Sequence, residues 1–262
     1  FIAKGVLKQE EAPCFYIYEE TMNGRVQTGV CALTSIDDYK NGRIKKHEFT
    51  LPEKETDRVN NFLACLAHTE PVFFISRKND EADSLIEETK KTNSPVYDFV
   101  SEDGVTHRLW AMREPDKIAA LERIFSAMDA LYIADGHHRT ASSCRVGELL
   151  RKQNPDYTGD EEFNYIMAVI FSEESLQIMD YNRLLMDLGD YTPESFKEAL
   201  SKNFAVKEMG REMWRTEEKH TFSMYLGGSW FALTAKEGSF PADDPVESLD
   251  AAILQKNVFE GL

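Results

Sequence analysis

Residues 131–142, Leu-Tyr-Ile-Ala-Asp-Gly-His-His-Arg-Thr-Ala-Ser, constrain the fold of this chain more than any other segment. The first four are apolar and typical of a buried strand, whereas residues 140–150 are compatible with a helix. Gly136 stands between them and permits a tight turn, including a positive φ angle. The sequence therefore predicts a strand, a sharp turn and a helix in immediate succession.

The start of this predicted helix is suited to bind an anion. Its first backbone N–H groups have no acceptor within the helix, and the helix dipole favours negative charge there. Arg139 adds a permanently charged guanidinium that fits phosphate or carboxylate, and Asp135 could hold a metal ion or orient a hydroxyl group. The pattern predicts a phosphate site with acid–base chemistry beside it. The alternative is a structural turn, because Asp-Gly turns and surface histidines are common.

Composition narrows the class of protein. The 262 residues allow one large domain or two modest ones, and the 42% hydrophobic content is enough for a sizeable core. A net charge of −16 argues against a nucleic-acid partner held by the overall field, but a local basic pocket can still take a small phosphate. No apolar run reaches membrane-spanning length. Because the chain begins with Phe1, we expect it to be an interior piece of a longer protein.

The cysteines and the local patterns predict a cytoplasmic, mixed α+β protein. Four widely spaced cysteines without a Cys-X-X-Cys pair favour reduced thiols over zinc or disulfides. Hairpins are predicted within 15–33, 95–110 and 220–234, and helices over 54–68, 82–91, 115–130, 192–203 and up to 254. Further strands are predicted at 71–76, 161–171, 176–183 and 205–209. A boundary near residue 187 predicts a catalytic domain over 1–187 and a small α+β domain over 188–262.

Several stretches carry a resemblance to known families. At residues 135–139 the chain resembles the ParB/sulfiredoxin-like superfamily, whose members bind nucleotide phosphate with a Gly-containing, Arg-ending turn at a helix start. Over nearly its whole length it is similar to a large bacterial family, the domain of unknown function ten-fifteen. The matching stretches include 24–29, 45–48, 54–58, 97–99, 103–107, 132–141, 163–165 and 180–183. The resemblance implies a ParB/sulfiredoxin-like core with a phosphate-binding strand-turn-helix, plus a small C-terminal α+β part.

A more distant resemblance is to the free serine kinases, ParB-like enzymes that phosphorylate L-serine from a nucleotide. They carry a Lys-Pro-His-Glu segment, a Glu-rich helix, and an apolar strand ending in Asp-Gly-His-His-Arg. The matching pieces here are Lys46, His47 and Glu48, the helix over 54–61, and residues 135–139. The chain departs from the pattern because no proline separates Lys46 from His47, and because it ends before a late Pro-Lys-Thr element.

This resemblance implies roles for the matching residues. Glu48 would be the base for the substrate hydroxyl, beside the substrate-binding residues His47 and Lys46. Asp135 would act in catalysis and hold Mg²⁺, and His137 would act in proton transfer. The phosphates of ATP or ADP would be bound by Gly136, His138, Arg139 and Thr140.

The expected function is therefore a nucleotide-dependent phosphotransferase acting on free L-serine or O-phosphoserine. One alternative is a ParB-like nucleotide-binding regulatory or DNA-associated module, against which the acidic charge and the lack of a basic stripe argue. A nuclease is another, but only Asp135 offers an obvious carboxylate. Sulfiredoxin chemistry would need a cysteine where His137 and His138 stand. The sequence leaves the oligomeric state open, with a homo-oligomer among the alternatives, and His68, His107 and His220 are interpreted as structural.

Overall fold

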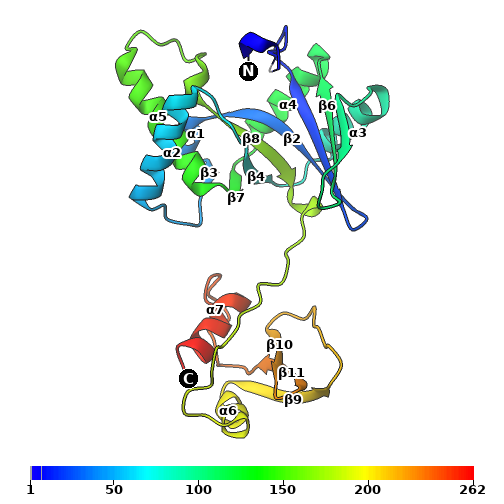
Figure 1. Ribbon diagram of the computed structural model, residues 1–262, viewed down its shortest axis with the longest axis vertical. Coiled ribbons are helices and arrows are strands. Elements are labelled where there is room, and N and C mark those ends of the chain that lie inside the picture. The colour runs from blue at the N-terminus through cyan, green and yellow to red at the C-terminus, as the bar shows by residue number, and fades with distance from the viewer. Residues whose placement is uncertain (1, 7) are drawn as a thin grey trace. The chain divides into compact units, whose positions relative to one another are not determined.

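The computed structural model describes residues 2–6 and 8–262 and is mixed α+β, as the sequence predicts. The chain divides into two compact units, Phe1–Met179 and Asp180–Leu262 (Figure 1). The division falls at Met179 rather than at the expected residue 187. The reason is that residues from 180 onward make their contacts within the second unit. Asp180 lies 3.8 Å from Arg215, and Arg183 donates a 3.1 Å hydrogen bond to Gln255.

Unit 1 is built on an eight-stranded mixed sheet with the strand order β3-β7-β4-β8-β2-β1-β6-β5. The predicted hairpins β1/β2 and β5/β6 are both confirmed as antiparallel pairs. The central pair β4/β8 is parallel, whereas β4 and β7 run antiparallel. The strands are β1 (Phe15–Met22), β2 (Arg25–Ser35), β3 (Ile44–Lys45), β4 (Val72–Ser76), β5 (Tyr97–Val100), β6 (Thr106–Met112), β7 (Leu131–Asp135) and β8 (Tyr165–Ser172).

The hydrophobic core of unit 1 lies on one face of this sheet. Val30, Ile170 and Phe74 are cross-strand neighbours on that face, and all three are buried. Four helices contribute side chains to the same core: α1 (Ile36–Lys40), α3 (Asp80–Thr92), α4 (Pro115–Ala127) and α5 (His137–Gln153). A further helix, α2 (Pro52–Cys65), packs against α5, where Ser142 donates to the Glu55 carbonyl. The short 3-10 turns are η1 (Ile2–Lys4), η2 (Glu162–Asn164) and η3 (Glu173–Ser175).

The strand predicted over residues 176–183 is wrong, since this segment has no regular structure. Its apolar, β-prone composition prompted the prediction, but a strand also needs a neighbouring edge for its backbone groups. No strand of the described residues pairs with it. Ile178, Met179 and Tyr181 are 100%, 72% and 86% exposed.

Unit 2 packs two helical segments on one small sheet. Thr192 caps α6 (Pro193–Leu200) in a capping box with Ser195, and Pro193 takes the first helical position, as predicted. The sheet has the order β10-β11-β9, with β9 (Phe204–Gly210), β10 (Thr221–Leu226) and β11 (Ser229–Ala235). The chain ends with α7 (Asp250–Leu254) and the π-helical turn η4 (Gln255–Phe259). Among the described residues, no helix combines the length and apolarity needed to cross a membrane.

Candidate functional site

The predicted strand-turn-helix is present as β7, Gly136 and α5. Gly136 has φ 90° and ψ 30°, a left-handed conformation that is unfavourable for residues with a Cβ atom. A Cβ atom at this position would lie 3.0 Å from Val72 Cγ1 and 3.2 Å from Arg139 Nε. The backbone conformation therefore favours glycine, and a Cβ atom would also make tight contacts with Val72 and Arg139. This turn sets the direction of α5 and the position of the side chains in its first turn.

The N-terminus of α5 has no side-chain cap and no acidic residue in its first turn. The first helical hydrogen bond runs from the Thr140 N–H to the Gly136 carbonyl, at 2.8 Å. In such a helix the three preceding N–H groups point outward without an intrahelical acceptor. This end of α5 therefore offers the amides of residues 137–139, together with the positive end of the helix dipole, to an external anion.

Thr140 itself belongs to the turn. Its side chain is fully buried, and its hydroxyl donates to the Gly136 carbonyl at 3.0 Å. The hydroxyl is thus already paired and shielded from a ligand. The structure assigns Thr140 a structural role in place of the expected phosphate contact.

Glu48 and His47 lie against the first residue of α5. Glu48 Oε2 is 3.6 Å from His137 Nδ1, and the His47 and His137 rings meet edge to face with centroids 4.4 Å apart. The Glu48 side chain is 57% exposed, whereas the His137 side chain is 4% exposed. The fold thus brings the two sequence motifs together and leaves the Glu48 carboxylate exposed to solvent.

The environment of His137 favours its neutral ring. Burial and the adjacent His47 lower the pKa of His137, and the nearby Glu48 carboxylate opposes them only partly. A neutral ring with its proton on Nδ1 presents that proton toward Glu48. His137 Nε2 is then a buried acceptor, and it has no hydrogen-bond partner among the described residues. An unpaired buried nitrogen is uncommon in folded proteins.

His138 connects α5 to the loop that carries Glu48. Its Nε2 accepts a 3.2 Å hydrogen bond from the backbone N–H of Leu51, the residue that precedes α2. An accepting Nε2 leaves Nδ1 as the donor nitrogen of the ring. Only the Nδ1 proton of His138 is then available for the expected phosphate contact.

Arg139 is held by three oxygen acceptors at the beginning of β4 and the end of β7. Its guanidinium donates to the Asp135 carboxylate at 2.7 Å, to the Pro71 carbonyl at 2.5 Å and to the Glu70 carboxylate at 3.4 Å. The Arg139 side chain is 20% exposed and that of Asp135 is 72% exposed. A phosphate approaching Arg139 therefore meets a cation that Asp135 already orients, and it must share this guanidinium.

The residues around Asp135 do not form a resident metal site. No group of three or more His, Cys, Asp or Glu side chains among the described residues could hold a metal ion. Asp135 is a single exposed carboxylate paired with Arg139. It suits Mg²⁺ only where phosphate oxygens supply further ligands, which is how Mg²⁺ commonly binds with nucleotides.

The family model described as "Protein of unknown function (DUF1015)" matches residues 1–252. The chain belongs to the DUF1015 family. Searches of curated proteins and of solved structures found no match to it. The match covers every residue of the candidate site.

Some participants in this DUF1015 site carry no signal in the sequence. Glu70 and the Pro71 carbonyl enter because the start of β4 lies beside the end of β7, which only the strand order reveals. The Leu51 amide is a backbone group that no composition pattern marks. Conversely, one residue that the sequence predicts in the site lies elsewhere. The expected substrate-binding residue Lys46 lies over the Tyr39 ring, with Nζ 5.3 Å from the centroid. The structure thus associates Lys46 with α1.

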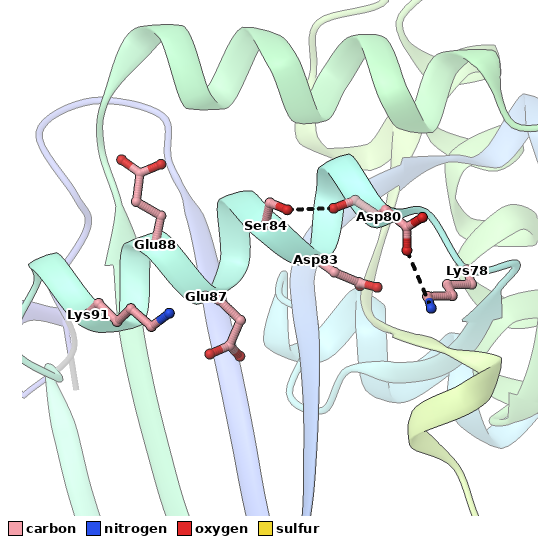
Figure 2. A pocket seen from close by; sticks show the side chains of 7 residues that line it. All are labelled: Lys78, Asp80, Asp83, Ser84, Glu87, Glu88 and Lys91. Carbon is pink, nitrogen blue, oxygen red and sulfur yellow. Dashed lines mark hydrogen bonds and ion pairs between the residues drawn. The ribbon is translucent and has the colours of Figure 1, made fainter.

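A surface hollow of this DUF1015 chain lies along α3 and contains none of the expected site residues. Figure 2 shows its lining, with Asp80 near Lys78 and Ser84 donating to the Asp80 carbonyl. Burial raises the pKa of Asp83 there. The lining residues are Lys78, Asp80, Asp83, Ser84, Glu87, Glu88 and Lys91. Four carboxylates outnumber two lysines in this lining and repel a phosphate. The hollow is therefore less suited than the start of α5 to bind a phosphate group.

Proposed function

We propose that this protein is a nucleotide-dependent phosphotransferase that transfers a phosphoryl group to the hydroxyl group of free L-serine, or in the reverse direction takes it from O-phosphoserine. One observation carries the proposal. An exposed carboxylate, Glu48, lies beside His137 at the uncapped N-terminus of α5, with Arg139 in the same turn. Phosphoryl transfer needs a base for the acceptor hydroxyl and positive groups for the phosphate oxygens. This cluster supplies both.

The proposed reaction assigns one step to each group. The acceptor hydroxyl gives its proton to Glu48, and its oxygen attacks the terminal phosphorus of the nucleotide. The bond from that phosphorus to the bridging oxygen breaks, and the shortened nucleotide leaves with the electron pair. The α5 amides and Arg139 hold the phosphate oxygens while charge develops on them. His137 lies beside this carboxylate, with Nδ1 3.6 Å from Glu48 Oε2.

In this proposal Mg²⁺ would bind together with the nucleotide. Bound between phosphate oxygens, it would neutralise charge on the transferred group. Asp135 is the protein carboxylate that fits it, because its side chain is 72% exposed at the end of β7. The ATP or ADP that supplies the phosphates is part of the same proposal.

The choice of serine rests on the resemblance of residues 46–48 and 135–139 to the free serine kinases, and so does the proposed ParB/sulfiredoxin-like core. A cytoplasmic location is also proposed. Four free thiols support it, because such thiols persist in a reducing compartment.

Phosphorus NMR tests the proposal directly. The protein is mixed with L-serine, Mg²⁺ and, in separate samples, ATP, ADP, GTP or pyrophosphate, and O-phosphoserine is followed over time. The reverse reaction starts from O-phosphoserine and ADP or AMP. Formation of O-phosphoserine that is lost in Glu48→Gln is the expected result. Nucleotide binding without transfer in either direction, with every donor, would overturn the proposal in favour of a nucleotide-binding regulatory module.

A further inference from the structure

We propose that His138 is a positioning residue, which places the Glu48 loop through the backbone N–H of Leu51. Its role in turnover rests on the function proposed above, but the contact itself does not. The loop is the segment 46–51, which begins with Lys46-His47-Glu48 and ends at the start of α2. His138 is thereby assigned a contact other than the expected one with phosphate.

The geometry carries this inference because two uncapped helix starts meet at a single hydrogen bond. Leu51 precedes α2 and His138 is the second residue of α5, and neither helix has a side-chain cap. The Leu51 N–H donates to His138 Nε2 at 3.2 Å. Without this acceptor, the Leu51 N–H would lose the only partner that the described residues give it.

The loop is held at both of its functional ends by successive residues of α5. His137 faces Glu48 at 3.6 Å and meets the His47 ring, and His138 accepts from Leu51 three residues further along the loop. Near the same end, Thr50 donates to the Glu55 side chain within α2. His138 therefore fixes the point at which the loop joins α2, and His137 lies against the residues at the loop's other end. Since α5 also presents the phosphate-binding amides, this contact sets Glu48 relative to the phosphate site.

A phosphate ligand and a positioning residue respond differently to substitution. A residue that binds phosphate changes the affinity for the nucleotide. A residue that places the base changes kcat and leaves that affinity unaltered. The alternative assignments of His138 are thus separable by measurement.

The contact can be removed from either side, which permits a double-mutant test. His138→Leu deletes the acceptor, and His138→Gln keeps a side-chain oxygen of similar reach. Leu51→Pro deletes the N–H, and the φ of −89° and ψ of 127° at Leu51 lie close to what proline accepts. Leu51→Ala keeps the N–H and is the matched control for the lost side chain.

The first measurement is amide hydrogen exchange, which needs no enzymatic activity. His138→Leu is expected to speed exchange of the Leu51 amide by about five- to tenfold, the factor that one lost hydrogen bond implies. In His138→Gln it should remain within about twofold of the wild-type rate. Unchanged exchange in His138→Leu would overturn the proposal, whatever the protein's activity.

The second measurement is the kinetic split in the phosphotransferase assay. His138→Leu and Leu51→Pro should each lower kcat with the nucleotide KM unchanged, and the double variant should be no slower than either. His138→Gln and Leu51→Ala should keep most of the activity. A raised nucleotide KM with unchanged exchange would make His138 a phosphate ligand instead. If the wild-type protein transfers no phosphate, the proposed function fails, while the exchange result still decides the contact.

Discussion

Two helices of unit 1 follow strands of the same sheet, α3 after β4 and α5 after β7, yet their first turns differ in the features that govern anion binding. At α3, the Asn79 side chain accepts from the Ala82 N–H at 3.0 Å, and the first turn contains Asp80, Glu81 and Asp83. At α5, Gly136 offers no side-chain acceptor, and the first turn contains two histidines and an arginine. The cap and the three carboxylates at the start of α3 disfavour an anion there, whereas the start of α5 has no side-chain cap and no acidic residue in its first turn.

The difference shows that the capacity of a helix N-terminus to bind an anion depends on the absence of capping and acidic side chains as well as on the presence of basic ones. Capping and acidic side chains stabilise α3, but they also occupy a free N–H group and compensate the positive end of the helix dipole. The first turn of α5 lacks this stabilisation. Its side chains instead bind neighbouring segments, since Arg139 donates to Asp135 and Pro71 and His138 accepts from Leu51.

The largest effect is expected for Glu48→Gln. Removing the base while keeping the shape of the side chain should lower kcat by about 100-fold or more, as for other general bases. Phosphorus NMR of serine phosphorylation measures the rate. Glu53→Gln, an exposed acid in the first turn of α2, is the matched control and should leave the rate unchanged. Equal losses in both variants would show that the overall charge acts, and that Glu48 is no base.

A smaller effect is expected for Arg139→Gln. Charge-assisted hydrogen bonds contribute about 1.5–3 kcal/mol, so the nucleotide Kd should rise by about tenfold or more. Isothermal titration calorimetry measures it. Arg123→Gln removes an arginine of α4 that pairs with Glu81 in the first turn of α3, and should leave the nucleotide Kd unaltered. If Arg123→Gln weakens nucleotide binding as much, the contrast between the two helix starts is wrong.

At α3 the expected effect is on stability alone. Asn79→Ala removes the cap acceptor of Ala82 and should lower the free energy of unfolding by about 1 kcal/mol. Urea unfolding provides this value, and nucleotide titration of the same variant should match the wild type. Asn79→Asp keeps an acceptor and is the control, with stability near the wild-type value. A change in nucleotide affinity would indicate that α3 takes part in binding.

The smallest effect concerns pH. Because burial and His47 hold the pKa of His137 below its ordinary value, the unfolded chain binds a proton at this position more readily than the folded one. Stability from this group is present above about pH 6.5, the ordinary imidazole value, and is lost as pH falls toward the lowered pKa. Urea unfolding at pH 7.5 and 5.5 should show a smaller loss of stability in His137→Gln than in the wild type. An equal loss in the two proteins would refute the neutral, buried assignment of His137.

Much of the local structure was predictable because short-range patterns dictate it. Alternation and turn residues identified the β1/β2 and β5/β6 hairpins, and Thr192-Pro193 identified the start of α6. The segment 176–183 shows where such reasoning fails. Its composition favours a strand, but no strand of the described residues pairs with it. The same limit applies to Lys46, which sequence neighbours associate with Glu48 and which the fold places over Tyr39.

The strand-turn-helix of residues 131–153 follows from local sequence, because Gly136, the apolar strand and the small-residue helix act on neighbouring positions. Membership of the DUF1015 family could likewise be predicted from the sequence. The groups that meet at that turn are set instead by the tertiary structure. Glu48 reaches His137, Leu51 reaches His138 and Glu70 reaches Arg139 through long-range packing of β4, β7, α2 and α5. Such contacts depend on strand order and helix packing, which no local pattern of residues encodes.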